Sequence, residues 1–436
     1  MEPELRFDVL DWIGRADAGD PAVSTLGALT IEGGGVRPWV LTRVEDTLAA
    51  SVRPHIRVPA VQLAEWLLVH WWRLRWESDS SRTETSWVYA HRMSSISRDV
   101  PWPALELSSD GESVQLRMEP EPMADVAGVR YLERVAVEVP ARDFERAVDR
   151  FVAVVEQRLA QCTPGYRTLS ELREELAEER RRPSLARECR WQARAGLAPG
   201  CADDAWVERA RGLVDDLGAV SGEDALGTLS AGDHDLGKLE RAIEAMKRST
   251  TSLDLTWATL AERTTAAELP WERGSRLAKQ LRAREKLGDG PLSNERLSDL
   301  VSAFIPLRGE LVKSALSGGY RNGVSGGRTR IVWGSTRVES QRFHIGRLLG
   351  EAHVLGPEEH LLPVSDAGTA LQKLGRSFAQ ELLCPWEALD AYTDEHGLDD
   401  EALSDAAAHF EVSELLVRST LVNRGKLDRW RITPRQ

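Results

Sequence analysis

Residues 232–238 have the spacing of a phosphate-binding loop, Gly-x-x-x-x-Gly-Lys. Such a loop binds phosphate through backbone N–H groups and the lysine, and a Ser or Thr after the lysine holds magnesium. Here Asp233 and Asp235 would face the phosphates, and Leu239 replaces the hydroxyl residue. We therefore interpret the segment, with its His234-Asp235 pair, as a polar turn before a helix.

Three segments in the C-terminal part of the chain carry a family resemblance. Residues 342–351 read Arg-Phe-His-Ile-Gly-Arg-Leu-Leu-Gly-Glu, residues 376–385 read Arg-Ser-Phe-Ala-Gln-Glu-Leu-Leu-Cys-Pro, and residues 406–413 end in Phe-Glu-Val-Ser. In this order and spacing they resemble the ImmA/IrrE family of zinc-dependent metallopeptidases. That family combines Arg-Phe, three residues, His-Glu-x-x-His, a Phe-Ala-x-x-Leu-Leu-x-Pro helix end and a helical pair containing Val-Ser. The resemblance implies a mainly helical, zincin-like domain over residues 270–436.

The metal-binding positions of that family are changed in this chain. In His-Glu-x-x-His, two imidazoles on one helix face bind zinc and the glutamate is the general base. The five positions here are residues 347–351, Arg-Leu-Leu-Gly-Glu, and the third family ligand, an acid, falls near Gln372. A catalytic zinc site needs about three protein ligands. Arg347, Leu348, Glu351 and Gln372 are therefore interpreted as vestigial metal-site positions, and we expect no cofactor, no metal and no catalysis.

The substitution also predicts what replaces the metal. Arg347 and Glu351 are four residues apart, so their side chains share one helix face and can pair. We expect this ion pair to fill the former metal cavity, where a buried pair requires full hydrogen bonding.

A relocated metal site is an alternative to that ion pair. His344, His353 and His360 lie close in the sequence to Glu351. On a continuous helix, however, His344 and His353 point in different directions. Gly356-Pro357 then ends the helix and leaves His360 in a loop, so a solvated helix end is the preferred interpretation.

Residues 401–422 have the layout of a helix-turn-helix, whose second helix would enter the DNA major groove. This second helix begins at Ser413 and follows the acidic segment 399–401. The family resemblance already accounts for the pair as packing within the domain, so DNA binding is the alternative. The DNA contacts would be Arg418, Arg424, Lys426 and Arg429.

Tryptophan is unusually common, with 15 residues, and the apolar segment 58–76 is rich in it. A helix that is apolar all round is usually buried. Tryptophan is also enriched in protein interfaces, so a partner surface is the alternative to a core helix. The residues of that surface would be Trp66, Trp71, Trp72 and Trp76.

The elements that position these residues indicate an α+β, multidomain protein. We expect an N-terminal α+β domain of unrecognised family at residues 1–163, because Asp110-Gly111 predicts a hairpin and apolar spacing predicts a helix over 141–160. A charged helical linker domain would occupy residues 164–269. Strands are predicted at 28–31, 39–43, 86–91, 104–107, 113–118 and 131–139.

Composition restricts the functional class. The chain has 436 residues, 42% of them hydrophobic, and a net charge of −13, which argues against a strong non-specific nucleic-acid binder. The acidic N-terminus has no signal-peptide layout and no apolar run is long enough to span a bilayer. The four cysteines form no C-x-x-C pair, so we expect reduced thiols and a cytoplasmic protein without a membrane partner.

Together these features predict a non-catalytic pseudo-metallopeptidase. The resemblance implies a regulatory component of a bacterial stress, mobile-element or phage-defence system that binds another protein of the same operon or system. Two alternatives stay open: a DNA-associated regulator that uses the C-terminal helical pair, and an enzyme with an unrecognised site in the N-terminal domain. The sequence does not name the oligomeric state.

Overall fold

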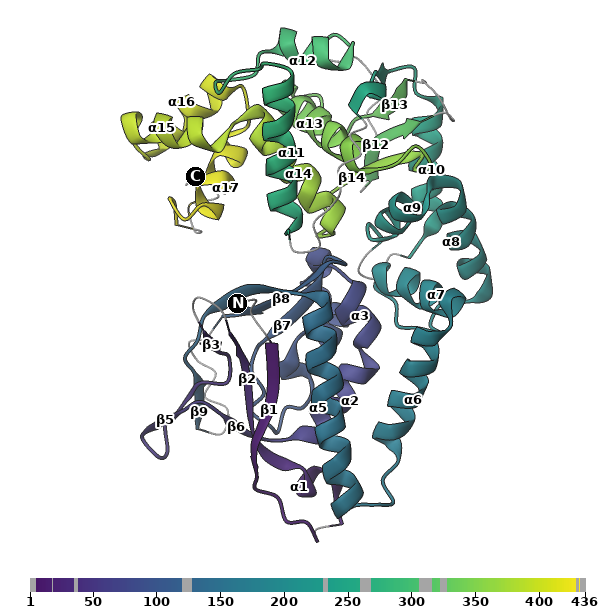
Figure 1. Ribbon diagram of the computed structural model, residues 1–436, viewed down its shortest axis with the longest axis vertical. Coiled ribbons are helices and arrows are strands. Elements are labelled where there is room, and N and C mark those ends of the chain that lie inside the picture. Colours follow the sequence, from purple (N-terminus) through teal and green to yellow (C-terminus); the bar gives the residue numbers. More distant parts are fainter. Residues whose placement is uncertain are drawn as a thin grey trace. The chain divides into compact units, whose positions relative to one another are not determined.

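The computed structural model describes residues 5–17, 19–34, 38–119, 128–229, 234–258, 268–305, 316–321, 328–428 and 431. The chain forms two compact units. The first contains Met1–Val207 and Leu229–His234, and the second contains Glu208–Thr228 and Asp235–Gln436. Each combines helices with antiparallel sheets, so the predicted α+β class is confirmed (Figure 1). The predicted boundaries near residues 163 and 269 each lie inside one of the units.

The main sheet of the first unit has the order β1-β2-β3, and β6 also pairs with β2. These strands are β1 (Leu5–Trp12), β2 (Leu26–Gly33), β3 (Trp39–Val40) and β6 (Ile56–Pro59). A second sheet consists of β7 (Glu106–Ser109), β8 (Ser113–Met118) and β10 (Val135–Pro140). The third contains β4 (Val44–Asp46), β5 (Ser51–Arg53) and β9 (Val129–Tyr131).

Helices pack against these sheets and form one apolar core with them. The longest helix, α5, buries Phe144, Val148, Phe151 and Val155, which recur at helical spacing as predicted. The helices are α1 (Pro21–Ser24), α2 (Ala60–Val69), α3 (Trp71–Trp76), α4 (Thr85–His91), α5 (Ala141–Cys162), α6 (Thr168–Arg181) and α7 (Pro183–Arg194).

Two local expectations for this unit were wrong. Residues 86–91 form helix α4 and not a strand, and the Trp87 ring stacks on His91 one turn later, 4.4 Å between centroids. Tertiary packing therefore overrides the β-propensity of this aromatic segment. The apolar segment 58–76 is not one helix, because the chain leaves helical geometry at His70 and continues as α3.

The second unit is built around a sheet of order β11-β13-β12-β14. Its strands are β11 (Ser252–Leu253), β12 (Leu316–Arg321), β13 (Thr329–Val332) and β14 (Leu361–Ser365). The sheet packs with the central helix α13 (Val338–Val354), and a second apolar core fills this region.

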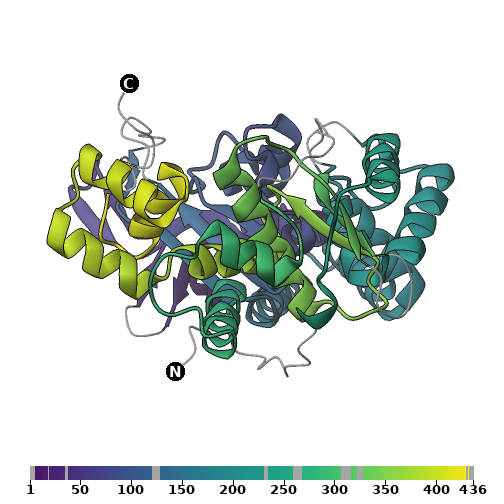
Figure 2. The same cartoon turned by 90° about the horizontal axis from the view of Figure 1, so that it is seen from above.

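The remaining helices of the second unit surround α13 and the sheet. Helix α14 (Ala370–Leu383) lies between α11 (Pro270–Arg284) and α13 and contacts both. Three C-terminal helices, drawn in yellow-green to yellow in Figure 2, contribute apolar residues to the same core: α15 (Trp386–His396), α16 (Asp400–Phe410) and α17 (Glu414–Asn423). The others are α8 (Asp204–Leu217), whose first turn belongs to the first unit, α9 (Ala219–Leu226), α10 (Leu236–Arg248) and α12 (Asn294–Val301).

Two sequence interpretations are answered by these elements. Asp235 is the N-cap of α10 and its carboxylate accepts a hydrogen bond from the Gly237 backbone N–H. The described part of the loop-like segment is thus a turn before a helix, while Asp233 lies outside the described residues. Among the helices of the described ranges, none is both long and apolar enough to cross a membrane.

Candidate functional site

The candidate site lies where α13 packs on α14. Glycines permit the close approach, because a Cβ on Gly346 would lie 2.8 Å from the Ala379 Cβ. A Cβ on Gly375 would lie 3.3 Å from the Glu351 Oε1, which shows that this carboxyl packs directly against α14. Arg347, Glu351 and Gln372, three of the positions interpreted as vestigial metal-site residues, therefore lie where these two helices meet.

Arg347 does not pair with Glu351, so the predicted ion pair is wrong. Its buried Nη2 donates to the Ser365 carbonyl, 2.6 Å away, and to the Gln372 Oε1. Neither oxygen of Glu351 has a hydrogen-bond partner among the described residues. The guanidinium is instead directed at acceptors from β14 and α14, which bind its Nη2, whereas its buried Nε has no hydrogen-bond partner among the described residues.

Gln372 is the centre of a hydrogen-bond network. Its Oε1 also accepts from the Ser365 backbone N–H at 3.0 Å. Its Nε2 donates to the Asp224 Oδ2 and to the Pro363 carbonyl, each at 2.6 Å. The other oxygen of Asp224 accepts from the hydroxyl of Thr369, the N-cap of α14. All four hydrogen-bonding positions of the amide are thus occupied.

This network has a member that sequence reasoning missed. Asp224 lies on α9, and it is separated from Gln372 by 148 residues. Helix α9 is held at its other end by Glu359, whose carboxylate accepts from the backbone N–H groups of Val220 at 3.0 Å and Ser221 at 2.8 Å. No periodicity or spacing in the sequence links these segments, so only the fold reveals the contact.

Glu351 is fully buried beside this network. Burial raises the pKa of its carboxyl well above the usual range, and the nearby Asp224 adds to that effect. The positive charges of Arg347, Arg321 and Arg376 lower the pKa without cancelling the increase. We therefore describe Glu351 as a carboxylic acid that favours its protonated, neutral form.

The neighbouring basic groups respond to burial in the opposite sense. Burial lowers the pKa of Arg347 to about 10, which still leaves it charged at neutral pH. Burial and then the charge of Arg347 lower the pKa of His344 to about 3, so this imidazole is neutral. His344 packs edge-on against Trp333, with 5.1 Å between the ring centroids.

These residues do not fit a zinc ion. A guanidinium has only donors, so Arg347 cannot coordinate a metal. The amide oxygen of Gln372 already accepts two hydrogen bonds, and Leu348 is buried in the apolar core. Glu351 would be the single suitable ligand, whereas a catalytic zinc site takes about three.

The histidines of the relocated site are not brought together. His353 contacts Trp257 and Phe378, with ring centroids 6.2 and 5.3 Å away, whereas His360 lies edge-on to Tyr320 at 6.4 Å. The described residues contain no group of three or more His, Cys, Asp or Glu side chains arranged to hold a metal ion.

The predicted DNA contacts are engaged within the second unit. Arg418 is almost fully buried and pairs with Asp400 and Glu414 at 2.9 and 2.5 Å. The Lys426 ammonium lies within 2.7 Å of both Asp390 and Asp394 carboxylates. The Arg424 guanidinium lies over the ring of Trp386 at 5.3 Å, and Arg429 lies outside the described residues.

The tryptophans of the predicted partner surface are mostly core residues. Trp66, Trp71 and Trp72 are buried, and Trp76 is half-buried. The Trp72 Nε1 donates to the Glu179 carboxylate at 2.6 Å, and the guanidinium of Arg180 lies over the Trp71 ring at 4.7 Å. The interpretation as a partner surface is therefore wrong, because tertiary packing covers these rings.

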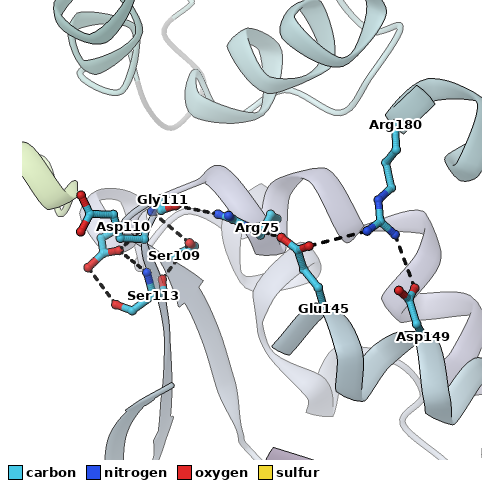
Figure 3. Close-up of polar contacts among 9 residues, drawn as sticks. Arg75, Ser109, Asp110, Gly111, Ser113, Glu145, Asp149 and Arg180 are labelled. Atoms are coloured by element: carbon cyan, nitrogen blue, oxygen red, sulfur yellow. Dashed lines mark hydrogen bonds and ion pairs between the residues drawn. The ribbon is translucent and has the colours of Figure 1, made fainter. Parts of the chain in front are cut away.

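Arginines connect this Trp-rich segment to its surroundings. Arg75 donates to the Glu145 carboxylate at 2.6 Å and to the carbonyl of Gly111, in the hairpin turn, at 2.9 Å (Figure 3). Arg180 is within 3.6 Å of Glu145 and 3.4 Å of Asp149. The chain of alternating charges thus joins α3, α5, α6 and the β7–β8 turn, and we assign it a structural role.

A second buried cluster in the first unit also escaped sequence reasoning. Arg73 donates two hydrogen bonds to Glu77, at 2.6 and 3.1 Å, and His91 lies 2.9 Å from the same carboxylate. Burial by itself would raise the pKa of Glu77, but the charges and hydrogen bonds of His91 and Arg73 lower it overall. The other ring nitrogen of His91 faces the Leu107 carbonyl at 2.6 Å. The polar groups of Arg73, Glu77 and His91 are thus bound to one another or to backbone carbonyls, and the cluster offers no free nucleophile.

Comparison of this chain with protein-family models, with curated proteins and with solved structures found no match.

Proposed function

We propose that this protein is a non-catalytic, pseudo-metallopeptidase component that binds another protein of the same bacterial system and regulates it. The observation that carries the proposal is the network of Arg347, Gln372 and Asp224. Two of its members, Arg347 and Gln372, stand at positions where the family resemblance implies zinc ligands. A structural hydrogen-bond network there supports a domain that keeps its shape and has lost its metal.

The chemistry of the network supports the same proposal. A general base or nucleophile must reach the group on which it acts. Here Gln372 and Arg347 are buried and directed at neighbouring backbone and side-chain atoms. Glu351, the remaining acid at these positions, is also fully buried and favours its neutral form. None of these groups is placed to activate water on a bound peptide.

The proposed partner follows from the resemblance. Domains of the ImmA/IrrE family occur in stress, mobile-element and phage-related regulation, where they cut or pair with a repressor. A domain that retains the fold without the metal would bind such a repressor without cleaving it. We propose that the partner is encoded beside this chain, in the same operon or system.

The proposal is tested by co-expressing the tagged full-length chain with each product of the adjacent genes. The purified complexes are analysed by intact-mass spectrometry for cleavage and by elemental analysis for zinc. We expect one product to bind and to keep its full mass, and zinc to be far below one ion per chain.

The matched control is the double variant Arg347→Ala/Glu351→Ala, prepared in the same way. The partner should have the same mass with either form of the protein. Cleavage of the partner by the wild-type chain alone, or one zinc per chain that the double variant loses, would contradict the proposal.

A further inference from the structure

Both ring nitrogens of His91, the last residue of α4, face oxygen atoms in the interior of the first unit. Its Nδ1 lies 2.6 Å from the Leu107 carbonyl of β7, and its Nε2 lies 2.9 Å from the Glu77 Oε2. A carbonyl or an ionised carboxylate only accepts hydrogen bonds, whereas a neutral imidazole has one donor and one acceptor nitrogen. A neutral His91 would therefore direct a lone pair at one of these two oxygens.

Glu77 does not supply the missing proton, because Arg73 favours its ionised form. The guanidinium binds both carboxylate oxygens, with Nε 2.6 Å from Oε2 and Nη2 3.1 Å from Oε1. Burial alone would raise the pKa of Glu77, but the charges and hydrogen bonds of His91 and Arg73 lower it overall. With Glu77 ionised, the geometry requires a proton on each ring nitrogen of His91.

The indole of Trp87 offers a favourable surface for the resulting positive charge. Its ring is stacked on that of His91, with 4.4 Å between the centroids and 11° between the planes. The Trp87 Nε1 donates to the Ser78 carbonyl at 3.0 Å, which holds the indole in this position. A cation over the face of a tryptophan is attracted to the ring, more strongly where water is excluded. The buried imidazolium is thus stabilised by an anion, a carbonyl and an aromatic face.

A second histidine close to this cluster is neutral. Burial, then the charges of Arg73 and His91, lower the pKa of His70 to about 4, although Glu77 acts in the opposite direction. His70 therefore carries no charge at neutral pH. Of these two histidines, His91 is the one whose ring contacts the Glu77 carboxylate.

Other charged groups lie on the elements that pack against α4. These elements are α3, β7 and the short helix Met93–Ser95. Their ion pairs join Arg75 of α3 with Glu145, and Glu106 of β7 with Arg82 and Arg92. These carboxylates are engaged by arginines, so Glu77 is the anion that balances the charge of His91.

We propose that His91 is a buried imidazolium whose second proton locks α4 to Glu77 and β7, and that alkaline pH releases this contact. Without that proton, a lone pair of the ring would face the carboxylate and the hydrogen bond would become a repulsion. The unfolded chain loses the proton near the ordinary histidine pKa of about 6.5. The stabilisation is therefore complete below that pH and is lost as the pH rises through the range in which the folded protein releases the proton. This proposal does not depend on the proposed function.

The test is nitrogen NMR of the full-length protein with ¹⁵N-labelled histidine side chains at pH 8. The two ring nitrogens of an imidazolium have similar chemical shifts, whereas those of a neutral imidazole differ widely. We expect the imidazolium pattern for His91, at a pH where an ordinary exposed histidine is neutral. His91→Gln assigns the signals by removing them. Trp87→Phe assigns them independently, because it changes the aromatic ring that is stacked on His91.

Glu77→Gln removes the charge that holds the proton and should convert the His91 signals to the neutral pattern. Glu84→Gln is the matched control, because it makes the same change at an exposed position immediately before α4. It should leave the imidazolium pattern intact. A neutral pattern for His91 in the wild type at pH 8 would overturn the proposal. An imidazolium pattern that persists in Glu77→Gln would overturn it as well.

Urea titrations monitored by tryptophan fluorescence test the effect on stability. The difference in unfolding midpoint between the wild type and His91→Gln should shrink as the pH rises from 6 to 9, because the wild type loses its lock and the variant has none to lose. A difference that stays constant over this range would contradict the release of the contact at alkaline pH.

Discussion

The residues of the hydrogen-bond network around Gln372 differ in how many neighbours they bind, and Gln372 binds the most. Its amide joins Arg347, Ser365, Asp224 and Pro363. Replacement by Leu keeps the approximate volume but leaves a buried guanidinium and a buried carboxylate without this partner. Breaking such a network costs about 3 kcal/mol or more.

We therefore expect Gln372→Leu to lower the free energy of unfolding by about 3 kcal/mol, measured by urea titration with tryptophan fluorescence. Gln380→Leu is the control, because Gln380 is half-buried on the same helix. A loss no larger than that of the control would show that the network contributes little to stability.

Glu351 gives a prediction for the pH dependence of stability. Its pKa is raised in the folded protein, so the folded state holds this proton more tightly than the unfolded chain. The resulting stabilisation is complete below the unfolded pKa, near 4.5. It is lost progressively as the pH rises toward the folded pKa, at no more than about 1.4 kcal/mol per pH unit.

Glu351→Gln replaces the neutral acid with a neutral amide and should remove this dependence. The free energy of unfolding of the variant, relative to the wild type, should therefore increase from pH 5 to pH 8. Urea titrations at each pH check this, with the exposed Glu395→Gln as control. A constant difference across the range would mean that Glu351 ionises normally in the folded protein.

At the scale of elements, sequence patterns predicted the turns and helices that depend on residues close together in the sequence. The Asp110-Gly111 turn appears between β7 and β8, with Gly111 at φ 99° as such a turn requires. Helix α5 follows its apolar spacing. The strand expected at residues 86–91 failed because the contact of Trp87 with His91 depends on how the segment packs.

In the candidate site, too, the sequence predicted the arrangement within one helix but not the contacts between distant segments. Sequence spacing placed Arg347 and Glu351 on one helix, and the structure places both in the interface with α14. It gave no indication that Asp224, far away in the sequence, would bind Gln372. Without that acid and the Ser365 carbonyl, Glu351 was the only visible partner for Arg347, which is why the ion pair was expected.

The packing of α13 on α14 can be tested through its glycines. In Gly346→Ala the new methyl group would approach the Ala379 Cβ to 2.8 Å, closer than real Cβ atoms come. Alanine normally favours a helix over glycine by up to about 1 kcal/mol. Here we expect a net loss of about 1–3 kcal/mol in the free energy of unfolding, because the two helices must move apart.

Gly212→Ala is the matched control, because Gly212 also lies within a helix, α8, and no atom beyond its chain neighbours lies within 4 Å of the position of an added Cβ. Urea titration of both variants should separate them clearly. Equal stability of the two variants would indicate that the helices are less tightly packed than the glycine contacts imply.

At the scale of the whole molecule, each of the two compact units is built from two separate stretches of the sequence. The segment Glu208–Thr228 belongs to the second unit, although it is separated from the rest of it by Leu229–His234. This segment carries α9, which supplies Asp224 to Gln372 and receives Glu359 at its N-terminus. The second unit is therefore incomplete without residues that lie before residue 229.

Two fragments test this dependence. A fragment of residues 208–436 keeps α9, whereas one of residues 235–436 leaves Gln372 and Thr369 without Asp224 and Glu359 without its backbone donors. Because buried polar groups without partners each cost about 1–3 kcal/mol, the shorter fragment should unfold at a clearly lower temperature. Circular dichroism during heating measures this.

Asp224→Asn in the longer fragment separates the loss of the acid from the loss of the whole helix: it keeps α9 but removes the buried charge that Gln372 and Thr369 bind. Its unfolding temperature should fall between those of the two fragments, whereas equal melting of all three would mean that α9 packs on the unit without supporting it.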